Sequence, residues 1–163
     1  MENKINEDGL NLLKSFEKLR LKAYDDAKPN YNLTENTKIL GHLTIGWGHT
    51  GKDVKWNSKI TEIDANKILE QDLKNAETIV HNLIKIKLND NQYSALVSFA
   101  YNSGGGFISK TTSKWTPYEL WRYINEGRTD IGAKWLKTAI TSKGVKMNGL
   151  VARRKAEYDL FAK

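Results

Sequence analysis

The hydrophobic periodicity of the sequence changes at Glu17, and this change limits the possible folds more than any other pattern in the chain. Before it, apolar residues recur every three positions, at Leu10, Leu13 and Phe16, and this spacing predicts the apolar face of a helix. Over residues 19–24, apolar and other side chains alternate, which predicts a strand. A second strand is predicted over residues 43–47. We therefore expect an α+β domain in which Glu17 lies where a helix ends and a sheet begins.

Two acidic residues flank the first predicted strand. In the last turn of a helix, Glu17 faces the negative end of the helix dipole, which favours its protonated form. Lys18 and Arg20 favour the ionised form, so the sequence leaves the balance open. Asp26 lies among turn residues, where solvent keeps it ionised. A carboxylic acid and a carboxylate in unlike surroundings can hydrolyse a glycosidic bond, although most such residues are ordinary surface acids.

Further along the chain, residues 44–49 read Thr-Ile-Gly-Trp-Gly-His, and residues 95–102 read Ala-Leu-Val-Ser-Phe-Ala-Tyr-Asn. Residues 149–154 read Gly-Leu-Val-Ala-Arg-Arg. Together with Glu17 and Asp26, which eight residues separate, these blocks resemble in their order the phage-type lysozymes of glycoside hydrolase family 24. The resemblance covers nearly the whole chain.

The resemblance implies a lysozyme-like fold with a cleft between two lobes. The small lobe is expected over residues 17–60, the helical lobe over 1–16 and 84–163, and a connecting helix over 61–83. The implied activity is that of an endolysin, which hydrolyses the β-1,4 bond between N-acetylmuramic acid and N-acetylglucosamine in peptidoglycan during host cell lysis. Glu17 would be the general acid, while Asp26 and Thr44 would hold the attacking water, with inversion at the sugar.

One departure from the family lies between Asp26 and Thr44. Seventeen residues separate them here, whereas the family has a much shorter segment. We interpret residues 28–41 as an insertion at the tip of the strand pair. Such an insertion costs little, because the entropy of loop closure grows only logarithmically with length.

Other residues of the resemblance are candidates for binding and structural roles. Thr50, Tyr101 and Asn102 are candidates for substrate binding, and each could equally be a packing residue. His49 resembles the histidine that pairs with an acid on the long helix, for which Asp72 is the candidate; a role as base or metal ligand is the alternative. The other two histidines have no evident partner in the sequence. Since no cluster of ligands is visible, we expect neither a metal nor another cofactor.

Composition bounds the class of protein. The chain has 163 residues, no cysteine and a formal net charge of +7, so it has the size of one domain and suits an anionic partner. The first eight residues are polar, and no apolar run reaches the length of a membrane span. With the resemblance, we expect a monomer acting on peptidoglycan, without nucleic acid or stable membrane insertion. It would stay in the host cytoplasm until a separate holin gives access to the periplasm and wall.

Local signals predict the helices. Start and stop residues place them at about 6–17, 61–83, 90–103, 117–126, 131–140 and 149–162. Thr116 and Pro117 are interpreted as the N-cap and first residue of the fourth helix. An arginine of the pair Arg153–Arg154 is expected to bind Glu157 on the last helix.

Two rival functions remain open at this point. A lytic transglycosylase cleaves the same bond with a single acid and leaves an anhydro sugar, and the presence of Asp26 argues against it. A basic module that binds the cell wall or nucleic acid without catalysis would share the charge and need neither carboxylate.

Overall fold

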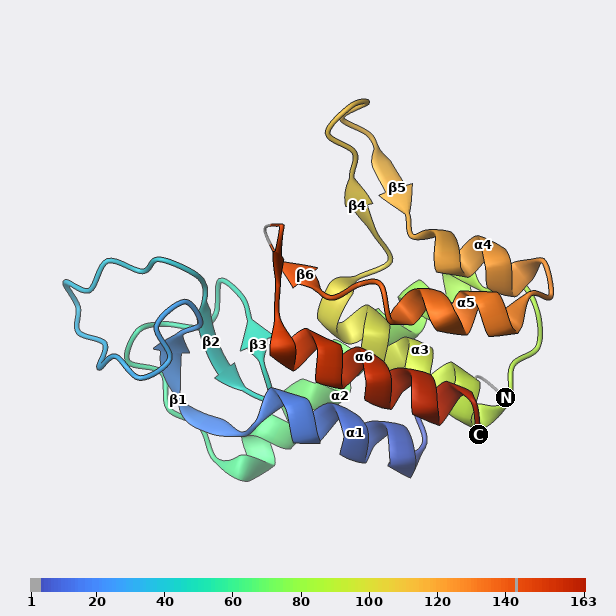
Figure 1. Ribbon diagram of the computed structural model, residues 1–163. Coiled ribbons are helices and arrows are strands. Elements are labelled where there is room, and N and C mark those ends of the chain that lie inside the picture. The colour runs from blue at the N-terminus through green and yellow to red at the C-terminus, as the bar shows by residue number, and fades with distance from the viewer. Residues whose placement is uncertain (1–3, 143) are drawn as a thin grey trace. The chain divides into compact units, whose positions relative to one another are not determined.

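The computed structural model describes residues 4–142 and 144–163 (Figure 1). By its contacts the chain divides into two compact units. Residues 17–72 form the first, which we call the sheet unit, and residues 1–16 with 73–163 form the second, which we call the helical unit. The division falls within helix α2 (Glu62–Leu83), whose first half belongs to the sheet unit.

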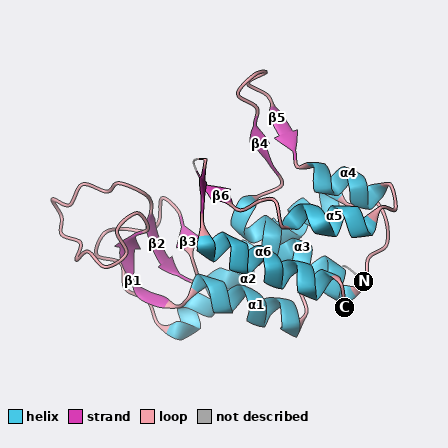
Figure 2. Cartoon of the chain, in the orientation of Figure 1, coloured by secondary structure: helices cyan, strands magenta, loops and turns pink. Residues whose placement is uncertain are grey.

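The sheet unit is built on three antiparallel strands in the order β1–β2–β3 (Figure 2). They are β1 (Arg20–Asp25), β2 (Leu43–Gly46) and β3 (His49–Thr50). Thr44 lies opposite Tyr24 on one side and opposite Thr50 on the other. Directly opposed residues of antiparallel strands share one face of a sheet, so these three side chains form a row across it.

The helical unit is organised around α3 (Asp90–Ser103), which is buried along most of its length. Leu96, Val97 and Phe99 have no exposed surface. The remaining helices of the unit are α1 (Glu7–Glu17), α4 (Glu119–Asn125), α5 (Thr129–Leu136) and α6 (Asn148–Phe161). Within this unit α3 packs against α6, and α4 packs against α5. No helix in the part of the chain that the structure describes is long and apolar enough to cross a bilayer.

The helix starts that sequence signals predicted are confirmed where a side chain caps the helix. Asn89 and Gln92 form a reciprocal capping box at the start of α3. Thr61 and Asp64 form the same kind of pair before α2, with the Asp64 amide donating to Thr61 Oγ1 at 3.1 Å and the Thr61 amide donating to Asp64 at 3.1 Å. Such pairs satisfy backbone donors from residues only three apart, so they can be read locally.

The predicted helix start at Thr116 is wrong. Residues Trp115–Pro117 form strand β5, which pairs antiparallel with β4 (Gly106–Ile108), and the helix begins only at Glu119. The two strands approach so closely that a Cβ on Gly106 would lie 2.2 Å from the Thr116 carbonyl oxygen. A second short hairpin, β6 (Thr141–Ser142) with β7 (Val145–Lys146), was not predicted either.

The last helix carries a buried ionic cluster that includes the predicted pairing of an arginine with Glu157. Glu157 is fully buried and contacts both Arg153, at 3.1 Å, and Arg154. Ser98 on α3 donates a hydrogen bond to Glu157 at 2.8 Å. The cluster therefore joins α6 to α3 through charged groups that are shielded from water, and their pairing offsets the cost of burying them.

Candidate active site

Glu17 is the last residue of α1 and lies against the turn between β2 and β3. The helix ends there because Lys18 adopts a left-handed backbone conformation with φ of 55°. A Cβ on Gly48 would lie 2.6 Å from Glu17 Oε2, and Gly48 has φ of 89°. The turn is itself fixed, since the Trp47 indole donates a hydrogen bond to Asn66 on α2 at 3.0 Å. Glycine at position 48 thus leaves the space that the Glu17 carboxylate occupies.

Asp26 follows β1 directly and is held by the strand opposite. Its Oδ1 accepts the backbone N–H of His42 at 2.7 Å, and its own N–H donates to the His42 carbonyl at 3.1 Å. Its other oxygen lies 3.2 Å from His42 Nδ1, a partner that the sequence did not reveal. The Asp26 side chain is nevertheless 41% exposed. It is therefore fixed in place and open to solvent, as an acceptor of a proton from water requires.

Asp25, which directly precedes Asp26, has a structural role that was not predicted from the sequence. Its carboxylate is buried and accepts the backbone N–H groups of Leu40, Gly41 and Ala27, at 2.7, 2.9 and 3.0 Å. The hydrogen bond from Leu40 is the largest of the effects that lower the pKa of Asp25. In the sequence, Asp25 was recognisable only as an acidic residue in a predicted turn. Asp25 closes the base of the segment 27–42, which contains the predicted insertion and has neither helix nor strand.

Thr44 is buried in the middle of the sheet, and its hydroxyl donates to the His42 carbonyl at 3.1 Å. Tyr24 lies opposite Thr44 in the sheet, and both acids influence the ionisation of its phenol. Burial is the main reason that the pKa of Tyr24 is raised; the charge of Arg20 opposes the rise, and the negative charges of Glu17 and Asp26 add to it. The Tyr24 phenol therefore lies in the electrostatic field of both carboxylates.

His49 is placed between two carboxylates. Its Nδ1 lies 2.8 Å from Asp72 Oδ2, and its Nε2 lies 3.1 Å from Asp53 Oδ2. Burial by itself would lower the pKa of His49, but the hydrogen bond and charge of Asp72, followed by those of Asp53, outweigh it and raise the pKa. The second acid was missed in the sequence, because a spacing of four residues implies contact only within a helix. This arrangement suits a structural ion pair that ties β3 to α2.

Two predicted substrate-binding residues belong to the helical unit. Tyr101 and Asn102 lie in the last turn of α3. The Asn102 side-chain oxygen accepts a hydrogen bond from Arg154 Nη2, which also donates to Ser103 at 2.8 Å. That oxygen is thus engaged in holding the buried arginine. The third predicted binder, Thr50, lies in the sheet unit at the exposed end of the row with Thr44 and Tyr24.

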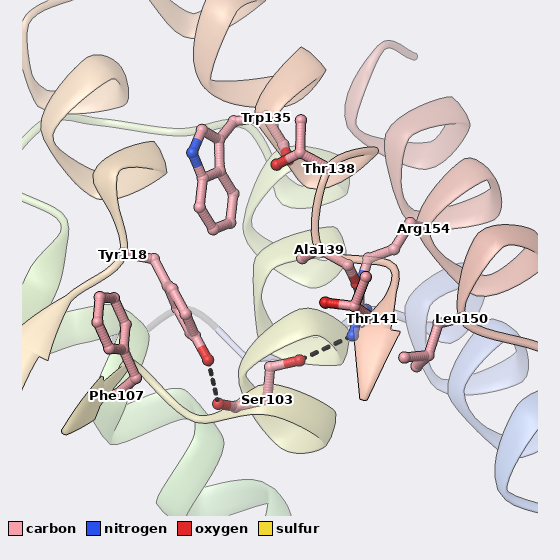
Figure 3. A pocket seen from close by; sticks show the side chains of 9 residues that line it. All are labelled: Ser103, Phe107, Tyr118, Trp135, Thr138, Ala139, Thr141, Leu150 and Arg154. Atoms are coloured by element: carbon pink, nitrogen blue, oxygen red, sulfur yellow. Dashed lines mark hydrogen bonds between the residues drawn. The ribbon is translucent and has the colours of Figure 1, made fainter. Parts of the chain in front are cut away.

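The helical unit also has a pocket of its own, with a volume of about 290 Å³ (Figure 3). Aromatic side chains line one wall, and serine, threonine, aliphatic and arginine side chains line the rest. The lining residues are Ser103, Phe107, Tyr118, Trp135, Thr138, Ala139, Thr141, Leu150 and Arg154. The Tyr118 hydroxyl donates to the Ser103 carbonyl at 3.3 Å. Neither the aromatic wall nor the pocket was predicted from the sequence.

Metal ligation has no visible basis among residues 4–142 and 144–163. No group of three or more histidine, cysteine, aspartate or glutamate side chains is placed there to hold a metal ion. The chemistry that the sheet unit offers is that of two separately fixed carboxylates. One is seated on the β2–β3 turn, and the other is hydrogen-bonded and open to water.

Comparison with known proteins gives a consistent result. The family model described as "Phage lysozyme" matches residues 14–157. An endolysin of Bacillus phage PZA is 40% identical over 96% of this chain and 54% of its own length. This chain spans about half the length of the curated relatives it matches first, the second being an endolysin of Bacillus phage B103.

Solved structures match along nearly the whole chain. The endolysin of Escherichia coli O157:H7 phage FAHEc1 is 31% identical, with a TM-score of 0.73 over 97% of this chain and 92% of that one. The muramidase domain of SpmX from Asticaccaulis excentricus is 29% identical, with a TM-score of 0.74 over 99% of both chains. The lysozyme-like fold predicted from the sequence is confirmed by these neighbours.

Proposed function

The chain belongs to the phage lysozyme family, and on that premise we propose that it is the catalytic part of an endolysin that hydrolyses peptidoglycan. The bond cleaved is the β-1,4 bond between N-acetylmuramic acid and N-acetylglucosamine. One observation carries the proposal: Glu17 lies against Gly48 of the β2–β3 turn, and the His42 backbone binds Asp26 in the same unit. Tyr24, which lies opposite Thr44, lies in the electrostatic field of both carboxylates. The groups that this reaction needs therefore belong to one compact unit.

In this mechanism Glu17 donates its proton to the glycosidic oxygen as the bond to the anomeric carbon breaks. Water attacks that carbon from the opposite face, and Asp26 takes the proton that the water loses. Thr44 orients the water together with Asp26, since a hydroxyl can both donate and accept. The configuration at the anomeric carbon is inverted, because water displaces the leaving sugar in one step. Proton exchange with solvent then restores the starting state.

The role of the ionised acid distinguishes this proposal from a lytic transglycosylase. In that reaction the muramic acid hydroxyl attacks in place of water, so no carboxylate needs to be open to solvent. Asp26 is both fixed by His42 and 41% exposed, which favours activation of water. Mass spectrometry separates the two reactions, since hydrolysis gives a reducing muramic acid end and transglycosylation gives an anhydro end.

The direct test compares Glu17→Gln with the unmodified protein on purified peptidoglycan. The variant keeps the shape of the side chain but has no proton to donate, so we expect the release of reducing ends to fall at least about a hundredfold. Glu70→Gln, an exposed change on α2, is the matched control and is expected to keep full activity. Equal activity of Glu17→Gln and the control would contradict the role given to Glu17, whereas no release of reducing ends by the unmodified protein would favour the non-catalytic binding module.

Access to the wall stays a prediction. We propose that the protein acts as a monomer and reaches the wall from the host cytoplasm once a separate holin has opened the membrane. Expression in host cells with and without a holin tests this, and lysis without one would contradict it. Size-exclusion chromatography with light scattering tests the monomer.

A further inference from the structure

The helical unit exposes its large apolar side chains on two hairpins. Among its described residues, those exposed are Phe107, Ile108, Trp115, Val145 and Met147. The first three belong to the β4–β5 hairpin, and Val145 and Met147 lie in or directly after the β6–β7 hairpin. The β4–β5 hairpin projects away from the helices of this unit (Figure 1). The bases of both hairpins line the same pocket, through Phe107 and Thr141.

The outer part of the β4–β5 hairpin has an apolar pair that the fold leaves more than half exposed. Ile108 and Trp115 lie directly opposite each other in the strand register and are 63% and 54% exposed. Phe107, by contrast, lies 5.7 Å from the ring of Tyr118 at the base. A backbone hydrogen bond from Ser109 to Lys114 closes the tip at 2.9 Å. The exposed pair is therefore held at the end of an ordered hairpin.

The charged side chains of both hairpins are all basic. The sequence contains no aspartate or glutamate over residues 91–118, which include the β4–β5 hairpin, or over residues 131–156, which include the β6–β7 hairpin. Lys110 and Lys114 are exposed at the tip of the first, and Lys146 is exposed on the second. The hairpins therefore present apolar side chains and lysines together, without acids between them. Such a surface is complementary to one that has an anionic outer layer and an apolar layer beneath it.

We propose that the two hairpins form a docking surface for an anionic phospholipid bilayer. Trp115 and Ile108 enter the interfacial region, where the amphipathic indole ring of tryptophan is favoured. Lys110, Lys114 and Lys146 lie among the lipid phosphates, whose negative potential attracts basic side chains. A glycan strand fits this surface less well, because sugars are bound by flat rings with hydrogen-bonding groups beside them, and Ile108 and Val145 offer neither. The attachment is peripheral and independent of the proposed catalysis.

Sedimentation with vesicles tests the proposal without any measurement of activity. The full chain is mixed with vesicles of equal parts phosphatidylglycerol and phosphatidylcholine, and separately with vesicles of phosphatidylcholine alone. We expect binding to the first that weakens with added salt, and little binding to the second. Lys110→Gln with Lys114→Gln should weaken binding roughly thirtyfold, since each lysine near the surface contributes about a factor of five. Ile108→Ser with Trp115→Ser should weaken it at least tenfold.

Matched changes on α2, outside both hairpins, are the controls. Lys67→Gln with Lys74→Gln, near the boundary on α2, removes the same charge from exposed positions, and Ile63→Ser removes an apolar side chain that is 68% exposed. Both should bind as the unmodified protein does, and thermal unfolding checks that every variant is folded. Three results would overturn the proposal. They are failure to bind the anionic vesicles, equal losses in hairpin and control variants, and hairpin-dependent binding to purified cell wall without binding to vesicles.

Discussion

A methyl group at Gly48 should lower activity ten- to a hundredfold while costing little more stability than the same change at another glycine. The reason is geometric: the new Cβ would lie 2.6 Å from Glu17 Oε2, whereas ordinary contact begins near 3.4 Å, so the carboxylate must withdraw by about 0.8 Å. It lies at the end of a flexible side chain and can do so. A displacement of about 1 Å at a reacting group can cost on the order of a hundredfold in rate.

Gly127→Ala supplies the control. Gly127 also has a positive φ, 76°, but a Cβ there would meet no atom within 4 Å. Both variants should lose about 1–2 kcal/mol from the left-handed backbone conformation, which corresponds to roughly 2–8 °C in Tm for a chain of this size. Only Gly48→Ala should also lose between ten- and a hundredfold in kcat/KM.

Two measurements are needed on each variant: thermal unfolding by circular dichroism, and release of reducing ends from purified peptidoglycan at a temperature well below both Tm values. If Gly48→Ala and Gly127→Ala had the same kcat/KM, the position of the Glu17 carboxylate against the β2–β3 turn would not matter for catalysis. The role given to that turn would then be refuted.

Three further results are expected. Because the pKa of His49 is raised in the folded state, protonated His49 stabilises the fold below its ordinary pKa near 6.5; Tm should fall as pH rises through the higher folded-state pKa, and fall less in Asp72→Asn. Asp25→Asn keeps one acceptor oxygen for three backbone donors, so limited proteolysis within residues 27–40 should become faster while cleavage elsewhere does not. Glu157→Gln leaves Arg154 buried without its charge partner, which should cost roughly 3–5 kcal/mol and lower Tm by about 10 °C.

Features that depend on neighbours along the chain could be predicted from the residues alone. The change from a helical to an alternating pattern at Glu17 set the junction of α1 and β1. Capping residues three apart set the starts of α2 and α3. The spacing of Arg153 and Arg154 from Glu157 set the ionic cluster on α6. In each case the partners are within four residues of one another, so a local pattern contains the whole interaction.

The other features could be seen only in the folded chain, because the residues that interact there are far apart in sequence. Thr116 and Pro117 have the local pattern of a helix start, yet they pair with β4 because Gly106 lets another strand approach. Asp25 resembles any turn acid until Leu40 and Gly41 return to it. The seat of Glu17 on Gly48 depends on a contact across thirty-one positions of sequence. The sequence identified the candidate acids. Only the folded chain shows which groups each carboxylate contacts, and those contacts determine how it can act.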